Sequence, residues 1–187
     1  PFKEVSHFKT GDLEWTTQPV KHRVPCLAYS CYLPRSGRFD VERAKAAGIP
    51  VQLWSHLQNG ESVTHEGRTF QPEDVLGPAR RGLRLSYATD CRPAPALAEL
   101  VRESDLFVAE GLYGDCDKQQ DAASKGHMVF CEAAQLAADA DVKELWFTHY
   151  SPAMLNPKDY LAKAREIFPN CHSGHNLKTT TLRFEEK

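Results

Sequence analysis

Residues 144–152, ELWFTHYSP, place a histidine at the end of an apolar run. The run at 145–147 is followed closely by a Ser-Pro pair, and short apolar segments that end in such breakers are typical of buried strands. His149 is therefore expected at the carboxyl end of a short buried strand. Two interpretations are open: a structural histidine whose hydrogen bonds close the strand, or a ligand directed into a site.

Similar short units are found along most of the chain. The patterns predict two or three strands within residues 1–33. Beyond residue 82, strands are predicted at 83–90, 105–113, 142–150 and 179–184, and helices at 93–104, 128–141 and 156–168. Strands and helices that alternate in short units indicate an α/β fold, in which crossover helices connect the strands of a layered sheet.

Residues 34–82 interrupt this alternation with many glycines and prolines. A short helix is predicted at about 40–47, because Gly48 and Pro50 would stop it. The rest of the segment is weakly hydrophobic and punctuated by turn residues. It is therefore expected to form a surface excursion and to make a poor layer of the core.

The composition is that of an ordinary globular protein of 187 residues, with a formal net charge of −2. This charge gives no overall attraction to nucleic acid, so such binding would have to come from a local patch. No apolar run reaches the roughly 18 residues of a membrane span. The six cysteines include no CxxC pair, which favours reduced, mostly buried thiols in a cytosolic protein.

Three successive predicted strands end in polar residues: Asp90, Glu110 and His149. Ligands of open α/β sheets bind beyond the carboxyl ends of the strands, so these side chains are candidates for one shared site. His127, which precedes a predicted helix, is a fourth candidate. Each has a structural alternative: Asp90 and His127 as helix caps, Glu110 as a turn residue or a partner of a site residue, and His22 as an exposed strand residue.

The chemistry of these side chains fits metal binding. Neutral imidazole and carboxylate are ligands that suit zinc. A carboxylate can bridge two metal ions while histidines complete each coordination sphere, and two-metal sites cleave phosphodiesters by stabilising the attacking and leaving oxygens.

Eight segments occur in the order found in the second half of the ribonuclease Z family, the endonucleases that remove the 3′ trailer from transfer RNA precursors. They are KHRVPCLAYSCYL (21–33), GRFDVERAKAAGIP (37–50), LQNGESVT (57–64), RTFQPEDVLGP (68–78), LSYATD (85–90), EGLYGD (110–115), KGHMVFCEAAQLA (125–137) and ELWFTHYSP (144–152). The resemblance covers nearly the whole chain. It implies a metallo-β-lactamase fold, an αββα sandwich with two zinc ions, of which residues 1–187 would form part of a single domain, mainly its C-terminal half.

The resemblance assigns a role to four residues. His22 resembles the histidine that ligates one zinc ion, Asp90 the bridging aspartate, and His149 the histidine ligand of the other zinc ion. His127 resembles the histidine of the family's His-Ser-Thr segment, which is implicated in catalysis near the leaving group. This sequence reads His127-Met128-Val129 there, so only the histidine is carried over.

Residues 37–82 resemble the region that holds the family's transfer RNA-binding arm and its linker. Arg38, Arg43 and Lys45 are expected to contact phosphates of the RNA. Further basic residues of this region are Arg35, Arg68, Arg80 and Arg81. The alternative for all of these charges is a solvated surface.

The family's signature His-x-His-x-Asp-His does not occur in this sequence. It supplies further metal ligands, so His22, Asp90 and His149 are expected to form only part of the metal site and to hold zinc weakly. The resemblance implies a cytoplasmic, homodimeric, zinc-dependent endoribonuclease acting on precursor transfer RNA, with the activity of this chain alone in question. Two alternatives remain: another metallo-β-lactamase-fold phosphodiesterase and a non-catalytic RNA-binding protein.

Overall fold

A computed structural model describes residues 3–185 and divides the chain into two compact units. Unit 1 is formed by residues up to Leu33 and from Leu83 onward, and unit 2 by Pro34–Gly82. The long strands β3 (Cys26–Arg35) and β6 (Arg80–Ala88) lead out of and back into unit 1. Unit 2 is therefore an insertion between two neighbouring strands of the sheet.

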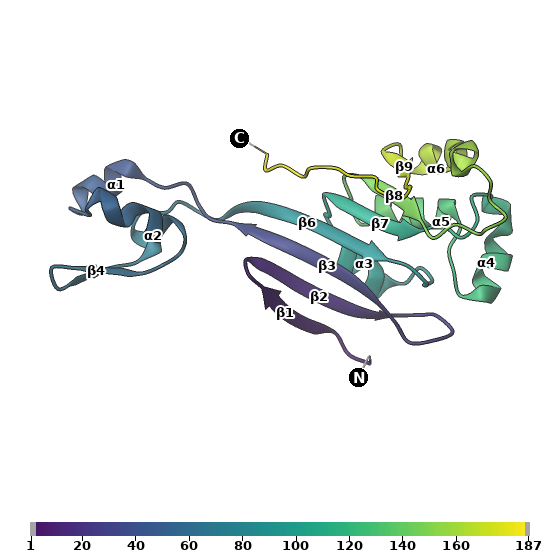
Figure 1. Cartoon of the computed structure of the whole chain (residues 1–187), viewed down its shortest axis with the longest axis horizontal. Coiled ribbons are helices and arrows are strands. Elements are labelled where there is room, and N and C mark those ends of the chain that lie inside the picture. The colour runs from purple at the N-terminus through teal and green to yellow at the C-terminus, as the bar shows by residue number, and fades with distance from the viewer. Residues whose placement is uncertain (1–2, 186–187) are drawn as a thin grey trace. The chain divides into compact units, whose positions relative to one another are not determined.

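Unit 1 is built on a seven-stranded sheet of order β1-β2-β3-β6-β7-β8-β9 (Figure 1). The other strands are β1 (Ser6–Thr10), β2 (Leu13–Val20), β7 (Leu106–Glu110), β8 (Leu145–Thr148) and β9 (Cys171–Ser173). The first three strands pair antiparallel, whereas β6 to β9 pair in parallel. The parallel strands bring their carboxyl ends to one edge of the sheet.

Helices cover one face of this sheet. They are α3 (Pro95–Val101), α5 (Phe130–Asp139) and α6 (Leu161–Ile167); α4 (Gln119–Lys125) precedes α5, and short 3-10 turns lie at Cys116–Lys118 and Pro157–Tyr160. α5 packs against β7, β8, α3 and α6. The core between them is completely buried at Phe107, Phe130 and Phe147, and the rings of Phe130 and Phe147 stack with their centroids 4.0 Å apart.

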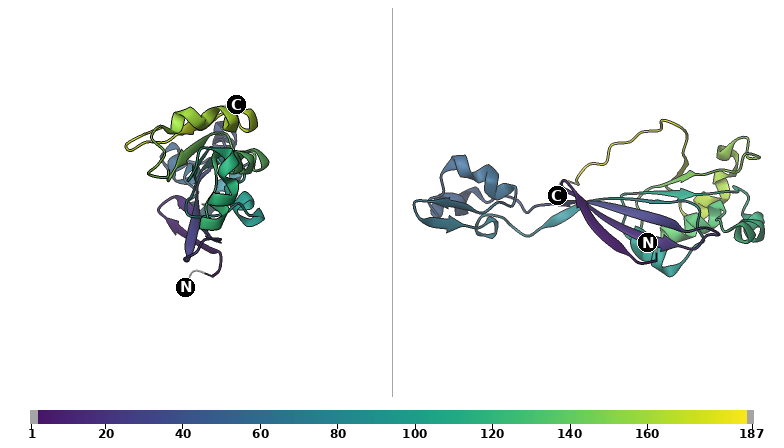
Figure 2. Two further views of the ribbon diagram at one scale, coloured as in Figure 1. Left: turned by 90° about the vertical axis from the view of Figure 1, so that its right-hand side faces the viewer. Right: turned by 60° about the horizontal axis from the view of Figure 1, so that its bottom comes forward.

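The opposite face of the sheet carries exposed apolar side chains. Along β6, Ser86 and Ala88 are buried, while Leu85 and Tyr87, which alternate with them, are exposed by 39% and 44%. Tyr29 of β3 is also exposed. A strand that alternates in this way has one packed face and one open face. The views in Figure 2 show the sheet with its helices gathered toward one side of unit 1.

Unit 2 has a hydrophobic core of its own. Its elements are α1 (Val41–Ala46), α2 (Trp54–Gln58), the hairpin β4 (Val63–His65) and β5 (Arg68–Phe70), and 3-10 turns at Val51–Leu53 and Pro72–Asp74. The Asp40 side chain caps α1 by accepting the Arg43 backbone N–H at 2.9 Å. Leu57, Phe70 and Val75 are buried. As expected, the segment adds no residue to the buried cluster of unit 1, and its few apolar residues are spaced so that they form a small core of their own.

Unit 2 also contains a close approach of two backbone segments. A Cβ atom on Gly37 would lie 2.0 Å from the Gly77 carbonyl oxygen, so only glycine fits at this position. The Gly77 N–H donates to the Arg38 carbonyl oxygen at 2.9 Å. The segments that enter and leave unit 2 are thus held together by their backbones.

The structure confirms the predicted α/β pattern and corrects it in two places. The strand predicted at 179–184 is absent, and β9 at Cys171–Ser173 pairs with β8 instead. Thr179, Thr180 and Thr181 are β-branched, but residues 179–184 form no strand. The second correction is α4, which was not predicted; it ends at Gly126, whose φ of +84° stops the helix.

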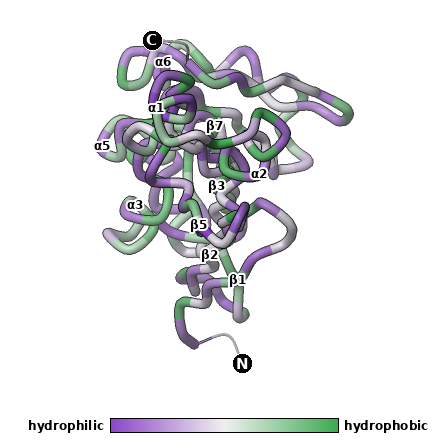
Figure 3. Tube along the Cα trace, turned by 90° about the vertical axis from the view of Figure 1, so that its left-hand side faces the viewer, coloured by the Kyte–Doolittle hydropathy of each residue, from purple (hydrophilic) through white to green (hydrophobic). Residues whose placement is uncertain are grey.

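The hydropathy of the trace shows short hydrophobic stretches separated by hydrophilic ones (Figure 3). None of the helices in residues 3–185 combines the length and the apolar character needed to cross a membrane.

Candidate metal and catalytic site

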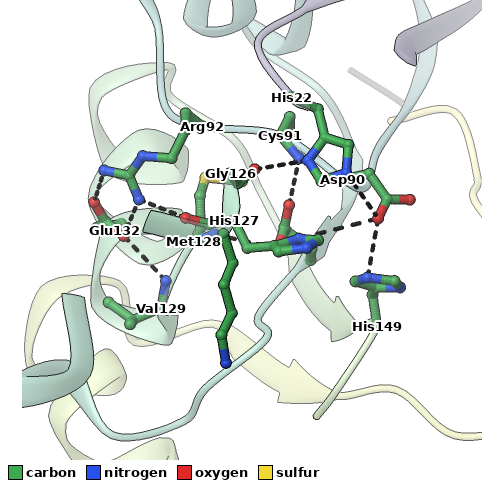
Figure 4. A network of polar contacts seen from close by, with 12 residues as sticks. His22, Asp90, Cys91, Arg92, Gly126, His127, Met128, Val129, Glu132 and His149 are labelled. Carbon is green, nitrogen blue, oxygen red and sulfur yellow. Dashed lines mark hydrogen bonds and ion pairs between the residues drawn. The ribbon is translucent and has the colours of Figure 1, made fainter. Parts of the chain in front are cut away.

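The Asp90 carboxylate lies at the centre of three imidazoles (Figure 4). Its Oδ1 atom is 3.1 Å from His149 Nε2 and 4.0 Å from both His22 Nε2 and His127 Nδ1. Asp90 follows β6 with a left-handed backbone, φ +53°. It does not cap α3, whose N-cap residue is Ala94. The structural alternative for Asp90 is therefore excluded.

His22 is held by the loop that follows α4. Its Nδ1 atom is 3.1 Å from the Gly126 carbonyl oxygen. A carbonyl only accepts hydrogen bonds, so Nδ1 carries a proton, and in the neutral ring the lone pair of Nε2 lies on the side of Asp90. This arrangement is common for metal-ligating histidines, whose second nitrogen is fixed by a hydrogen bond.

His127 is positioned by Glu110, the last residue of β7. Its Nδ1 atom forms a hydrogen bond with Glu110 Oε2 at 2.9 Å. Glu110 is completely buried and also accepts the backbone N–H groups of Cys91 and Met128. Glu110 is thus a partner of a site residue and no solvated turn residue. His127 caps no helix, since the N-cap of α5 is Val129.

Burial changes the proton affinity of this pair. Desolvation raises the pKa of the Glu110 carboxyl to about 7, although its two backbone hydrogen bonds oppose the shift. Desolvation, followed by the charges of His22 and His149, lowers the pKa of His127. Because the two groups are hydrogen-bonded to each other, their titrations are coupled.

His149 follows β8 with a left-handed backbone, φ +55°. Its ring stacks on that of His127, with centroids 5.3 Å apart, and the His22 and His127 centroids are 4.8 Å apart. The run before it is buried as predicted, because Leu145, Trp146 and Phe147 are at most 8% exposed. The strand therefore presents His149 to the same place as Asp90.

Arg92 holds the backbone of His127 in place, and the sequence did not predict this role. It forms an ion pair with Glu132 and also donates to the His127 carbonyl oxygen. Glu132 in turn accepts the Val129 N–H at the start of α5, at 3.1 Å. The Arg92 contacts span 35 and 40 residues, so no local sequence pattern could have indicated them.

The donor set fits a metal ion. Ligand atoms of His22, Asp90 and His127 lie within 4.8 Å of one another, and His149 adds a further imidazole beside Asp90. Since Nδ1 of His127 is engaged by Glu110, only its Nε2 atom is available for other partners. The structure thus brings together all four of the predicted residues, His22, Asp90, His127 and His149.

The remaining predicted residues belong to unit 2. Arg38, Arg43 and Lys45 have exposed side chains. Arg43 pairs with Asp40 at 3.3 Å, and Lys45 with Glu42 at 2.9 Å. Lys45 and Glu42 are exposed by 60% and 82%, so this ion pair contributes little to stability and leaves the cation open to solvent.

One expectation about cysteine is corrected near the site. Cys116 and Cys131 form a disulfide that joins the loop after β7 to the first turn of α5. Their separation of 15 residues gives no CxxC signal. The other four cysteines are free, and Cys31, Cys91 and Cys171 are buried as expected.

Comparisons with known proteins agree with this architecture. The family model of the β-lactamase superfamily domain matches residues 8–150. The ribonuclease Z of Clostridium acetobutylicum is 45% identical over 178 residues, which are 95% of this chain and 58% of that protein. The ribonuclease Z of Lachnospira eligens is 46% identical over 168 residues, 90% of this chain and 55% of that protein. The chain thus spans a little over half the length of these relatives.

Solved structures with low sequence identity share the fold. The metallo-β-lactamase fold protein YhfI of Bacillus subtilis matches with a TM-score of 0.57 at 18% identity, over 90% of this chain and 49% of that one. The short form of human tRNase Z matches with a TM-score of 0.56 at 14% identity, over 95% of this chain and 46% of that one. The expected metallo-β-lactamase fold is confirmed, and by the family match over residues 8–150 the chain belongs to the β-lactamase superfamily.

Proposed function

We propose that this chain carries part of the active site of a zinc-dependent endoribonuclease that removes the 3′ trailer from precursor transfer RNA. The observation that carries the proposal is the convergence of three imidazoles on the Asp90 carboxylate. It occurs in a chain that is 45–46% identical to two proteins named ribonuclease Z over at least 90% of its length.

His22, Asp90 and His149 would hold the metal, two zinc ions when the site is complete. Bound zinc would stabilise negative charge on the oxygens of the reacting phosphate. Further ligands are required, because the sequence contains no His-x-His-x-Asp-His segment. Three protein ligands shared between two metal ions leave each sphere incomplete, so we expect weak zinc binding by this chain.

His127 would donate a proton to the leaving oxygen. Glu110 fixes the His127 ring through Nδ1, so the proton would be transferred from Nε2. Arg92 would act as a positioning residue, since it holds the backbone carbonyl of His127.

Unit 2 would bind the RNA. Arg38, Arg43 and Lys45 are exposed cations, and such groups bind phosphates with a strong dependence on salt. We further propose a homodimer, in which the arm of one subunit presents transfer RNA to the other. An enzyme of this kind would act in the cytoplasm, where glutathione and thioredoxin would keep the Cys116–Cys131 pair open.

The test uses a precursor transfer RNA with a labelled 3′ trailer. With the His-x-His-x-Asp-His half of the site supplied, we expect zinc-dependent cleavage at the trailer junction, loss of cleavage with a chelator, and recovery when zinc is added back. His149→Ala should weaken zinc binding at least tenfold in competition with a chromophoric chelator, while Arg43→Gln should not. Zinc affinity unchanged by His149→Ala would refute the metal assignment.

The missing His-x-His-x-Asp-His segment favours one second candidate, a non-catalytic RNA-binding protein. The two functions are separated by the same experiment. RNA binding without cleavage at any zinc concentration would favour the binding protein for this chain, whereas cleavage at a site other than the trailer junction would favour a different phosphodiesterase.

A further inference from the structure

A cluster of exposed cations borders His127, and we call Arg23, Tyr113, Lys118 and Lys125 the cationic rim. The Lys125 ammonium donates to the Tyr113 hydroxyl and lies 5.0 Å from the centroid of its ring. The Lys118 ammonium lies 5.4 Å from the same centroid. One aromatic ring thus gathers two positive charges, through cation–π contacts that hold each lysine near it.

The cationic rim is joined to the candidate site by two side chains that contact successive backbone carbonyl groups. Arg23 Nε donates to the Lys125 carbonyl oxygen at 3.1 Å, and the neighbouring His22 contacts the next carbonyl, that of Gly126, at 3.1 Å. His127 follows directly in the chain. Arg23 therefore lies next in the chain to a proposed metal ligand, and Lys125 lies two residues before the proposed proton donor.

Within residues 3–185, none of the cations Arg23, Lys118 and Lys125 takes part in an ion pair. Other cations near the site are paired, as Arg92 is with Glu132 and Lys163 is with Asp117. Asp117 adjoins Lys118 in the chain, but its carboxylate is directed to Lys163 at 3.4 Å. Like charges held close together without partners favour an anionic ligand.

We infer that the cationic rim binds backbone phosphates of the RNA strand next to the bond that is cleaved. This inference rests on the proposed function and extends it to residues outside the metal site. A guanidinium fixed at Nε keeps its terminal N–H groups for a phosphate, and ammonium groups act as point charges on neighbouring phosphates. The rim would align the strand, so its loss should raise KM more than it lowers kcat.

The experiment measures binding of a fluorescein-labelled oligouridylate of eight nucleotides by anisotropy between 50 and 200 mM salt. For single strands, the slope of log affinity against log salt is about −0.7 per phosphate contact. The triple variant Arg23→Gln, Lys118→Gln, Lys125→Gln should therefore flatten the slope by about 2. Lys125→Arg keeps the charge and should retain most of the affinity.

Lys9→Gln is the matched control, because it removes a cation that is already paired with Glu14 at 2.7 Å. Urea unfolding of each variant verifies that it is folded. An unchanged slope in the folded triple variant, or an equal loss in the control, would overturn the inference. The proposed function is tested separately, since His149→Ala should abolish cleavage yet leave the oligouridylate slope intact.

Discussion

Asp90 and His149 each leave a strand with a left-handed backbone, at φ of +53° and +55°. Aspartate and histidine are among the few residues enriched in this conformation. The backbone at these positions turns the side chains toward each other instead of continuing the strand. Non-glycine residues in such conformations cluster at functional sites, and two of them meeting at 3.1 Å supports the proposed metal site.

Glu110 makes the stability of the folded protein depend on pH. Its pKa, raised to about 7 by burial, exceeds the ordinary value of 4.5. The folded state therefore binds a proton more tightly than the unfolded state, and the Glu110 contribution to stability decreases as pH rises from about 4.5 to about 7. At 1.36 kcal/mol per pKa unit, this contribution is on the order of 3 kcal/mol.

Glu110→Gln should remove this part of the pH dependence. Urea unfolding of the metal-free protein at pH 5, 6 and 7 measures it, as the difference between wild type and variant at each pH. The lowered pKa of His127 acts in the opposite sense and stabilises as pH rises. A difference that stays constant from pH 5 to pH 7 would disprove the assignment to Glu110.

Gly126 lies against the ring of His22. A Cβ atom there would lie 2.8 Å from His22 Nδ1, and its φ of +84° disfavours any side chain. Gly126→Ala should therefore cost more than about 1 kcal/mol of stability and should weaken zinc binding, because His22 must move.

Gly60→Ala separates the two effects. Gly60 has a φ of +85° but no atom within 4 Å of an added Cβ. We expect a similar cost from backbone strain without a change in zinc affinity. Equal zinc affinity in both variants would show that His22 is not displaced.

Among the elements, the loop after β7 and the start of α5 are joined by Cys116–Cys131. A disulfide that closes a loop of 15 residues stabilises by about 3 kcal/mol in the chain-entropy account. Reduction should lower the free energy of unfolding by this order. The double variant Cys116→Ser, Cys131→Ser should have the lower stability with or without reductant, and a wild type insensitive to reductant would contradict the prediction.

The helices of unit 2 depend on a small core that does not include the candidate site. Leu57 is completely buried there, and Leu→Ala substitutions in cores cost about 2–5 kcal/mol. Leu57→Ala should increase hydrogen exchange throughout residues 34–82 while leaving zinc affinity unchanged. Exchange that increases equally around His127 would show that the two units unfold together.

Apolar runs were the most predictable elements. The run at 145–147 is buried in the sheet, so composition alone indicates it. Residues 179–184 also have strand propensity, but a strand forms only where a neighbouring strand offers backbone hydrogen-bond partners. β9 pairs with β8 instead. Propensity is local, whereas pairing depends on chain segments that are distant in sequence.

For the molecule as a whole, position along strands predicted the site better than any single residue did. The rule that parallel strands present ligands at their carboxyl ends indicated Asp90, Glu110 and His149 together. It could not indicate that Glu110 is buried against His127, that Arg92 reaches the His127 carbonyl, or that Cys116 meets Cys131. Those contacts depend on the packing of loops.

The open face of the sheet has a consequence for behaviour in solution. Leu85 and Tyr87 are exposed by 39% and 44%, and exposed apolar patches promote association. We expect this chain to bind a hydrophobic dye, and Leu85→Lys should reduce the fluorescence without lowering stability by more than about 0.5 kcal/mol. Equal fluorescence of variant and wild type would place the exposed apolar surface elsewhere.

Because Gly37 and Gly77 meet at the base of unit 2, the segment between them could be replaced as a whole. The chain enters and leaves it through adjacent strands, and two backbone segments meet at its base, where Arg80 and Gln58 also donate to the Ser36 and Gly37 carbonyl oxygens. A segment of different length and charge could be spliced between these glycines while the sheet keeps its pairing. The RNA-binding role proposed for unit 2 could therefore be altered without changing the residues proposed to cleave the RNA.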